Sequence, residues 1–210
     1  MADSLPWIAA EAGTEARKHA PATLRNREPI ADALADLLPA GGTVLEIASG
    51  SGEHVAYLAG RYPGLRWQPS DPDPAALASI AAWCEGLKNV APPLELDAAA
   101  PVWPTAAADA IFCANMVHIA PWEAALGLMA GAGRVLAPGA PLILYGPFTR
   151  ADVPTAPSNL AFDDSLRSRD PRWGLRAVEA MDAVADQHGL ARERLLEMPA
   201  NNLMLVWRRN

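Results

Sequence analysis

Residues 43–52, Thr-Val-Leu-Glu-Ile-Ala-Ser-Gly-Ser-Gly, decide the fold of this chain. The apolar residues at the start of the stretch favour a short buried strand over 43–48, and the glycines that follow favour a tight turn. A helix is expected directly after the turn, over 53–61. In this arrangement the glycines let a ligand approach the backbone closely, and the helix N-terminus directs free N–H groups at that ligand.

The alternation of strands and helices extends in both directions from this unit. Hydrophobic periodicity predicts helices at 28–38, 74–85, 121–136 and 175–188, and strands at 65–68, 93–96, 109–114, 141–145, 193–197 and 202–207. Helices between strands predict a parallel sheet that is covered on both faces through right-handed crossovers. The last two strands lie close in sequence, which predicts an antiparallel hairpin. The expected fold class is therefore α/β: a Rossmann-like, mostly parallel sheet of seven strands with an antiparallel C-terminal strand.

The whole of 1–210 is expected to form a single domain, because neither a repeat nor a change in composition marks a boundary. The segment 146–174, which contains Pro, Ser and Asp residues, interrupts the alternation and is expected to be a long irregular loop. Its apolar and aromatic residues, among them Phe148, Phe162 and Trp173, favour a lid that packs on the domain.

Composition excludes several classes of function. The formal net charge of −7 argues against nucleic acid as the main partner, because phosphate binding needs a clustered excess of Lys and Arg. No apolar stretch is long enough to span a bilayer, and the N-terminal residues lack the features of a signal peptide. The four histidines show no ligand-like spacing to Cys84 and Cys113, so no metal site is expected. We expect a cytoplasmic protein that binds neither nucleic acid nor membrane, and its oligomeric state stays open.

The Gly-rich turn narrows the choice of cofactor. The dinucleotide fingerprint needs a third glycine where this chain has Val55, and the Gly-Lys-Ser/Thr of phosphate loops does not occur. An acid inside the strand, Glu46, followed by Gly50 and Gly52, resembles the first motif of class I methyltransferases. Ala48 stands where that motif usually has its first glycine. The resemblance implies that S-adenosylmethionine is the cofactor and that these residues bind it.

Acidic residues also follow the next two strands. Asp71, about 20 residues after the turn, is placed to accept both ribose hydroxyls of a bound nucleoside. Its alternative role is to cap the helix that begins near Pro74, and Asp73 is the second candidate for either task. Since one side chain cannot do both, Asp73 can cap while Asp71 binds. Asp97, after the third strand, is placed to accept the amino group of adenine.

Longer strings resemble the methyltransferase-like 26 family, namely residues 46–54, 67–71, 114–122, 145–148, 169–174 and 198–202. The resemblance extends from about Pro21 to the end of the chain. It implies a class I methyltransferase fold and leaves the substrate open. It also implies that residues 1–27 form a segment that covers the site, in which Arg25 contacts the methionine carboxylate of the cofactor and Asn26 an anionic substrate.

The catalytic candidates follow the fourth and fifth strands. His118 is the first choice for a general base, because the usual pKa of histidine suits proton abstraction at neutral pH. The alternative is a ring that packs beside Ile119. Tyr145, at the end of the fifth strand, either orients the substrate or packs in the core. Asn115 is expected to offer its backbone carbonyl to the ammonium group of the cofactor, and it lacks the Asn-Pro-Pro-Tyr context of amino-directed DNA methyltransferases.

Three asparagines in the expected lid and hairpin, Asn159, Asn201 and Asn202, are candidates for substrate binding, although asparagine also forms turns. His54, in the first turn of the first helix after the Gly-rich turn, is less expected to face the substrate. The leading hypothesis is a methyltransferase that acts on a small molecule. The alternatives are a protein that binds S-adenosylmethionine without catalysis, as a sensor or interaction module, and a nicotinamide-dependent oxidoreductase.

Overall fold

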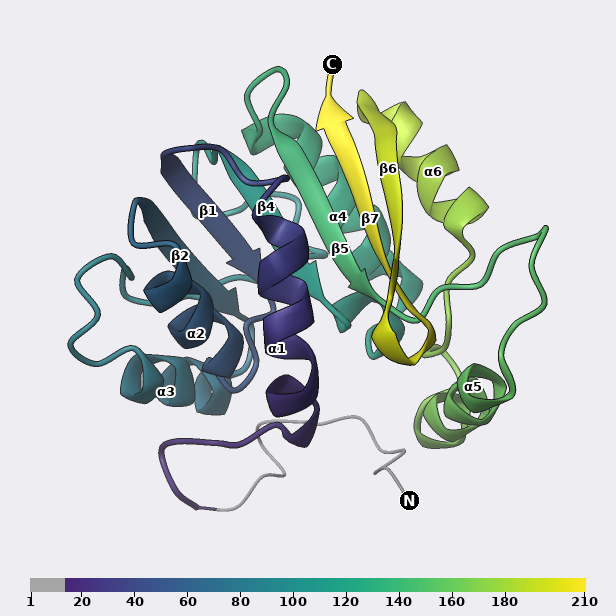
Figure 1. The fold of residues 1–210 in the computed structure, drawn as a ribbon, viewed down its shortest axis with the longest axis horizontal. Helices are drawn as coiled ribbons and strands as arrows, with labels where there is room; N and C mark the ends of the chain where they lie inside the picture. The colour runs from purple at the N-terminus through teal and green to yellow at the C-terminus, as the bar shows by residue number, and fades with distance from the viewer. Residues whose placement is uncertain (1–13) are drawn as a thin grey trace.

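The computed structural model describes residues 14–210, in which a seven-stranded sheet lies between two layers of helices (Figure 1). The strands are β1 (Gly42–Ile47), β2 (Leu65–Asp71), β3 (Leu94–Glu95), β4 (Ala110–Ala114), β5 (Pro141–Gly146), β6 (Leu190–Met198) and β7 (Asn202–Arg209). The α-helices are α1 (Pro21–Leu34), α2 (Glu53–Arg61), α3 (Pro74–Trp83), α4 (Trp122–Val135), α5 (Pro157–Arg169) and α6 (Val178–Gln187), and short 3-10 helices η2 (Met116–His118) and η3 (Pro199–Asn201) join them.

The strand order is β3-β2-β1-β4-β5-β7-β6. Strands β1 to β5 pair in parallel, and β7 runs antiparallel to both β5 and β6. This topology confirms the predicted fold class and the predicted C-terminal hairpin. None of the described helices is long and apolar enough to cross a membrane.

Side chains that alternate along the strands supply two separate cores. Val44, Phe112 and Ile143 face α1, α2 and α3 on one side of the sheet. Leu45 and Leu144 face α4 and α6 on the other side. All five are at most 1% exposed, and burying a side chain of this size contributes about 1.5–3 kcal/mol. The short central strands are therefore held on both faces, which fixes the position of their carboxyl ends.

Several element boundaries differ from those predicted. Helix α1 begins at Pro21 instead of residue 28, because proline in the first helical turn loses no intrahelical hydrogen bond. It ends at Leu34, before the predicted end at 38. Strand β2 continues through Pro69 to Asp71, since β3 pairs with Ser70 and Asp71 at its end.

The segment 146–174 was predicted to be a long irregular loop. This prediction is wrong in part, because the segment contains the helix α5. Only Asn159 and Leu166 of this helix are buried, so its sequence shows no apolar stripe that would have revealed it. The following helix, α6, begins at Val178 instead of residue 175. In Figure 1 α5 lies beyond the lower end of β5 and β7, close to the turn of the β6–β7 hairpin.

The carboxyl ends of the parallel strands lie together at the lower edge of the sheet in Figure 1. The chain leads from β1 outward to β2 and β3 and then returns to β4 on the other side of β1. In open α/β sheets ligands bind at such a reversal of strand order, outside the carboxyl ends of the strands. The turn after β1, the end of β2 and the residues after β4 all reach this edge.

Candidate functional site

The turn after β1 has an unusual backbone that neighbouring strands hold in place. Ala48, Gly50 and Gly52 have φ angles of 56°, 58° and 88°, in the left-handed region. Gly50 donates its N–H to Asp71 Oδ2 at 3.0 Å, and Ser49 donates its N–H to the carbonyl of Ser70 at 2.8 Å. Ala48 adopts the conformation that the usual glycine would have, at a cost of about 1–2 kcal/mol. The turn is therefore preorganised, with backbone groups fixed next to the end of β2.

Gly52 has a further reason to be glycine. A Cβ atom at this position would lie 2.7 Å from the Cα atom of Ile80 in α3. The start of α2 thus packs directly on α3, and a side chain would separate the two helices. The approach of a ligand is the role predicted for this glycine, and helix packing is a second requirement.

Glu46 lies in β1, directly before the turn, and its side chain is only 2% exposed. Its Oε2 atom has no hydrogen-bond partner among the described residues. Burial raises the pKa of this carboxyl to about 7; the nearby Asp71 charge adds to the rise, and a hydrogen bond from Ser49 opposes it. A buried acid with an unsatisfied oxygen next to a preorganised turn is suited to a ligand that brings a cation or a hydrogen-bond donor.

The three other acids predicted for the cofactor region differ in their surroundings. Asp71 is 7% exposed, and its two oxygens accept the N–H groups of Gly50 and Asp73, each at 3.0 Å. Burial raises its pKa, and the two backbone hydrogen bonds oppose that rise. Asp73 caps α3 by accepting the N–H of Ala75 at 2.8 Å. This geometry is consistent with the prediction that Asp73 caps the helix while Asp71 binds a ligand, because each carboxylate oxygen of Asp71 keeps a lone pair that can accept a further hydrogen bond.

Asp97 is exposed in the loop after β3 and accepts the N–H of Ala99 at 2.8 Å. Arg25 is exposed on α1, near the start of that helix. Both side chains remain accessible to a ligand from solvent.

The residues after β4 form a tight turn into η2. Asn115 has a φ of 62° and donates its N–H to the carbonyl of Tyr145 at 2.8 Å. Its own carbonyl, which was predicted to face the cofactor, accepts the N–H of His118 at 3.1 Å. Asn115 therefore lies at the junction of β4 and β5, and its carbonyl keeps one lone pair.

His118 is fully buried, and neither ring nitrogen has a hydrogen-bond partner among the described residues. The ring packs edge-on against Phe148, with the centroids 4.7 Å apart. Burial and, to a lesser extent, the charge of Arg176 lower the pKa of His118 to about 3. The alternative predicted for His118, a ring that packs instead of acting as a base, is what this arrangement has.

The segment after α5 encloses this histidine. Arg176 donates to the carbonyls of Val117 and Ala120 at 2.9 and 2.8 Å. Gly174 donates its N–H to the carbonyl of His118 at 3.0 Å. These bonds fix the region around 172–176 on the turn after β4.

Helix α5 is fastened at its start to the β6–β7 hairpin. Asn159 donates its side-chain amide to the carbonyl of Asn201 at 2.9 Å, and Asn201 donates its own amide to Ser158 Oγ at 3.2 Å. Asn202 instead donates to the carbonyl of Pro199 in its own turn at 3.0 Å. Of the three asparagines predicted for the substrate, two are therefore brought together across the edge of the sheet, and the third stabilises its turn.

The described part of the N-terminal segment lies against the start of α2 and the second half of α3. Ala20 donates its N–H to Glu53 Oε2 at 2.6 Å, and Lys18 donates its N–H to Ser79 Oγ at 2.8 Å. Ser79 in turn donates to the carbonyl of Ser51 at 2.6 Å. Residues 1–13 of the predicted covering segment lie outside the described residues. Glu53 and Ser79 are not predicted from the sequence, because single polar residues in a helix give no signal of such contacts.

His54 proves to be closely linked to one predicted residue. Its Nε2 atom lies 2.8 Å from Asn26 Oδ1. The only sequence signal was the position of His54 in the first turn after the Gly-rich motif. Contact with Asn26 depends on how α1 packs on α2, which no local pattern specifies.

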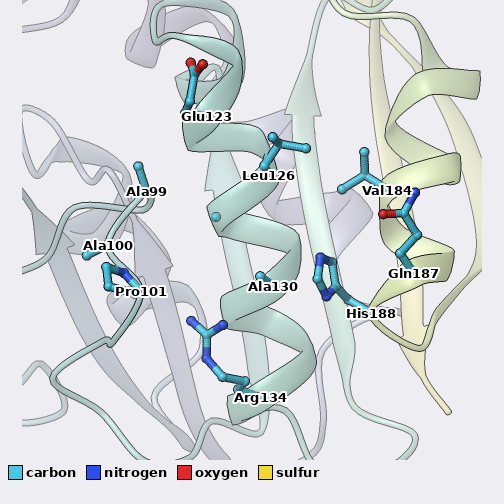
Figure 2. Close-up of a pocket in the computed structure, with 11 residues that line it drawn as sticks. Ala99, Ala100, Pro101, Glu123, Leu126, Ala130, Arg134, Val184, Gln187 and His188 are labelled. Carbon is cyan, nitrogen blue, oxygen red and sulfur yellow. The ribbon is translucent and has the colours of Figure 1, made fainter.

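A hollow of about 390 Å³ lies elsewhere, along the outer side of α4 (Figure 2). It lies between the loop at Ala99–Pro101 and the end of α6, where Val184 and His188 contribute. None of the predicted site residues lines it. Among the described residues no group of three or more His, Cys, Asp or Glu side chains is placed to hold a metal ion.

Solved structures of methyltransferases share this fold. The mitomycin 7-O-methyltransferase MmcR matches with a TM-score of 0.77 and 19% identity, over 90% of this chain and 54% of that one. CalO1, a methyltransferase in calicheamicin biosynthesis in its SAH-bound form, matches with a TM-score of 0.74 and 17% identity, over 90% and 54%. An O-methyltransferase family 2 protein from Planctomyces limnophilus, in complex with apigenin, matches with 0.73 and 21%, over 90% and 60%.

The chain spans little more than half the length of these solved proteins. The likeness establishes the class I methyltransferase fold. The chain itself belongs to the DUF938 family, described as proteins of unknown function, whose model matches residues 17–209.

Proposed function

We propose that this protein is a class I S-adenosylmethionine-dependent methyltransferase that acts on a small molecule. The observation that carries the proposal is the buried Glu46 carboxyl beside the left-handed turn after β1, whose Oε2 atom has no hydrogen-bond partner within residues 14–210. The ammonium group of S-adenosylmethionine fits this orphaned oxygen. The ribose hydroxyls fit the free lone pairs of Asp71, and the adenine amino group fits the exposed Asp97 carboxylate. When bound, the cofactor supplies an electrophilic methyl group.

The other cofactor-binding residues of the proposal surround these acids. Ala48, Gly50 and Gly52 shape the turn that the cofactor lies against. Asn115 offers its remaining carbonyl lone pair, and the exposed Arg25 attracts the methionine carboxylate. The resemblance of residues 46–54 and 67–71 to the methyltransferase-like 26 family supports the same assignment.

For catalysis we propose alignment and the exclusion of water as the main contributions. Well-oriented reactants and a dry site can account for a large part of the rate of a displacement reaction. Helix α5 and the region around 172–176 are suited to this task, because hydrogen bonds hold both of them over the edge of the sheet. His118 is a weak base with a pKa near 3, so we assign it proton abstraction only in a conformation in which 172–176 has moved.

The small-molecule substrate is supported by the overall acidic charge and by the similar solved proteins. MmcR is named for methylation of mitomycin, and the Planctomyces limnophilus protein is in complex with apigenin. In this proposal the substrate lies under α5, where Asn159 and Asn201 close one side. The aromatic residues Phe162 and Trp173 belong to the predicted lid, 146–174.

One observation favours a second function, that of a protein which binds the cofactor without transferring its methyl group. His118 has no exposed surface: Phe148 packs against its ring, and the region around 172–176 is hydrogen-bonded to the turn that carries it. A sensor would keep this closed form with the cofactor bound, whereas an enzyme must open it to admit a substrate.

The cofactor assignment is tested by replacing Asp71 and its neighbour Asp73 separately. Asp71→Ala removes the acceptor of the ribose hydroxyls, and charge-assisted hydrogen bonds of this kind contribute about 1.5–3 kcal/mol, so calorimetry should find S-adenosylhomocysteine bound about 10- to 100-fold more weakly. Asp73→Ala is the matched control: it removes the cap of α3 and should cost about 1 kcal/mol of stability while sparing the affinity. Equal affinity in wild type and Asp71→Ala would contradict the assignment.

A further inference from the structure

The four residues before α1, 17–20, form a strap that contacts α2 and α3. Lys18 donates its backbone N–H to Ser79 Oγ at 2.8 Å, and Ala20 donates its backbone N–H to Glu53 Oε2 at 2.6 Å. In Figure 1 the strap lies at the lower end of the molecule, on the side at which the parallel strands end. The strap is therefore attached to one side chain of each helix.

The two side chains that hold the strap also hold the Gly-rich turn. Ser79 Oγ donates to the carbonyl of Ser51 at 2.6 Å, and the Ser51 hydroxyl donates to Glu53 Oε2 at 3.0 Å. Ser51 lies between Gly50 and Gly52 in the turn. Ser51, Glu53 and Ser79 are each at most 6% exposed. A buried serine and a buried glutamate thus connect the strap to the turn.

This shared bonding makes the order of the turn depend on the docking of the strap. The turn contains Ala48, whose φ of 56° is left-handed, and a residue other than glycine keeps such a conformation only where its surroundings hold it. Without the strap, Glu53 would lose the N–H of Ala20 and the ring of His19, whose Nδ1 lies 3.2 Å from its Oε1. Water would then reach the carboxylate and compete with the Ser51 hydroxyl. The turn would be held less firmly.

We propose that Glu53 and Ser79 are positioning residues of the proposed cofactor site, and that docking of the strap and binding of the cofactor strengthen each other through them. The inference rests on the proposed function and adds a coupling between the strap and the Gly-rich turn. Neither side chain touches the ligand, and both act by fixing the backbone and the hydroxyl of Ser51. Such coupling is reciprocal: if docking raises the affinity for a ligand, the ligand favours docking by the same factor.

The outer end of the strap can be loosened without a change at the turn. The exposed Arg17 donates its Nε–H to the carbonyl of Ala82 at 3.0 Å, and its guanidinium carbon lies 5.4 Å from the centroid of the Trp83 ring. Trp83 donates its indole N–H to the carbonyl of Lys18 at 2.8 Å. Arg17→Ala and Trp83→Phe each remove one hydrogen bond of the strap and leave the Gly-rich turn unaltered.

The first test is calorimetric titration with S-adenosylhomocysteine. Arg17→Ala and Trp83→Phe should each bind it about three- to tenfold more weakly than wild type, because each loses a hydrogen bond that favours the docked strap. Arg61→Ala is the matched control: it removes an exposed ion pair with Asp32, at 3.3 Å, outside the strap, and should bind as wild type. Wild-type affinity in both strap variants would overturn the proposal.

Hydrogen exchange followed by NMR measures the docking itself. Saturating S-adenosylhomocysteine should slow the exchange of the Lys18 and Ala20 amides by about three- to tenfold or more, since these N–H groups exchange when the strap undocks. The loss of affinity in either strap variant should not exceed this slowing, because the coupling is reciprocal. The Gly139 amide, bonded to the carbonyl of Arg209 at the opposite end of the sheet, should not change. Unchanged exchange of both strap amides would contradict the coupling.

Two variants of Glu53 test its positioning role. Glu53→Gln retains an oxygen that can accept from both Ala20 and Ser51, whereas Glu53→Ala retains none. Glu53→Ala should therefore bind S-adenosylhomocysteine about tenfold more weakly and exchange the Ala20 amide faster, while Glu53→Gln should resemble wild type in both respects. A Glu53→Gln protein as weak as Glu53→Ala would refute the role of these hydrogen bonds.

The measurements also separate this inference from the proposed function. If wild type does not bind S-adenosylhomocysteine, the proposed function fails, and exchange in the ligand-free protein decides the inference. Arg17→Ala should then speed the exchange of the Gly50 amide, which is bonded to Asp71 in the turn, and equal rates in this variant and wild type would refute the coupling. If wild type binds and both strap variants bind equally well, only the present inference fails. Because Arg17 is exposed, Arg17→Ala decides the outcome if Trp83→Phe does not fold.

Discussion

Replacing Glu46 by Gln removes the charge of a buried carboxyl and keeps its shape. In wild type, burial raises the pKa of this group from 4.5 to about 7. The native state therefore binds the proton more tightly than the unfolded chain does. The contribution of protonated Glu46 to stability is fully present below pH 4.5, the unfolded value, and it is lost as the pH rises through about 7. Above that pH the native state holds a buried ionised carboxylate.

The size of the effect follows from the pKa shift. A difference between 4.5 and about 7, at 1.36 kcal/mol per unit, corresponds to about 3 kcal/mol. Glu46→Gln has no such penalty, so its stability relative to wild type should rise by about 3 kcal/mol between about pH 4.5 and about pH 8. Urea denaturation followed by circular dichroism at both pH values measures this difference.

The matched control is Glu95→Gln, a change of the same kind at an exposed position on β3. It should give nearly the same difference from wild type at both pH values. If Glu46→Gln also shows no change between the two pH values, the argument that the Glu46 carboxyl is buried and unpaired is refuted. Glu46→Gln should also bind S-adenosylhomocysteine more weakly than wild type, since the amide offers no negative charge to the ammonium group of the ligand.

Two further perturbations test the account. Burial lowers the pKa of His118 to about 3. Between this value and 6.5 the unfolded chain binds a proton at this residue that the native state does not bind, so wild type should lose stability as the pH falls below 6.5. His118→Phe should lose about 3 kcal/mol less between about pH 6.5 and about pH 4, which urea denaturation at these values measures; equal losses would show that the ring is accessible. Gly52→Ala should cost about 2 kcal/mol or more, because its Cβ would meet Ile80 and its φ is positive, whereas Gly60→Ala within α2 has open space and should gain about 0.5–1 kcal/mol. Thermal unfolding compares the two glycine variants, and equal effects would contradict the packing argument.

The overall fold could be predicted because its signals are local. The apolar run at 43–48, the glycines after it and the repeated alternation each specify one element, and the order of elements leaves few topologies. The helices that were not predicted correctly are those whose positions depend on packing between distant segments. Helix α5 buries only Asn159 and Leu166, so it has no apolar stripe. The start of α1 is largely polar, so hydrophobic periodicity does not reveal it, and it lies within the covering segment that the family resemblance implies.

The candidate site divides in the same way. The assignment of a cap to Asp73 depends on neighbouring residues, and the hydrogen bond to Ala75 agrees with it. The turn that carries His118 is hydrogen-bonded to Gly174 and Arg176, which are far along the chain. The unpaired oxygen of Glu46 is likewise a property of the packed molecule. Such contacts between segments that are distant in sequence leave no periodic signal for a single sequence to carry.

The central claim, that the edge of the sheet beside Glu46 and Asp71 binds S-adenosylmethionine, is tested most directly by calorimetric titration of the purified protein. S-adenosylmethionine, S-adenosylhomocysteine and NAD are titrated in parallel under the same conditions. The account predicts saturable binding of both adenosyl compounds and no binding of NAD. Binding of NAD, or of none of the three, would contradict it.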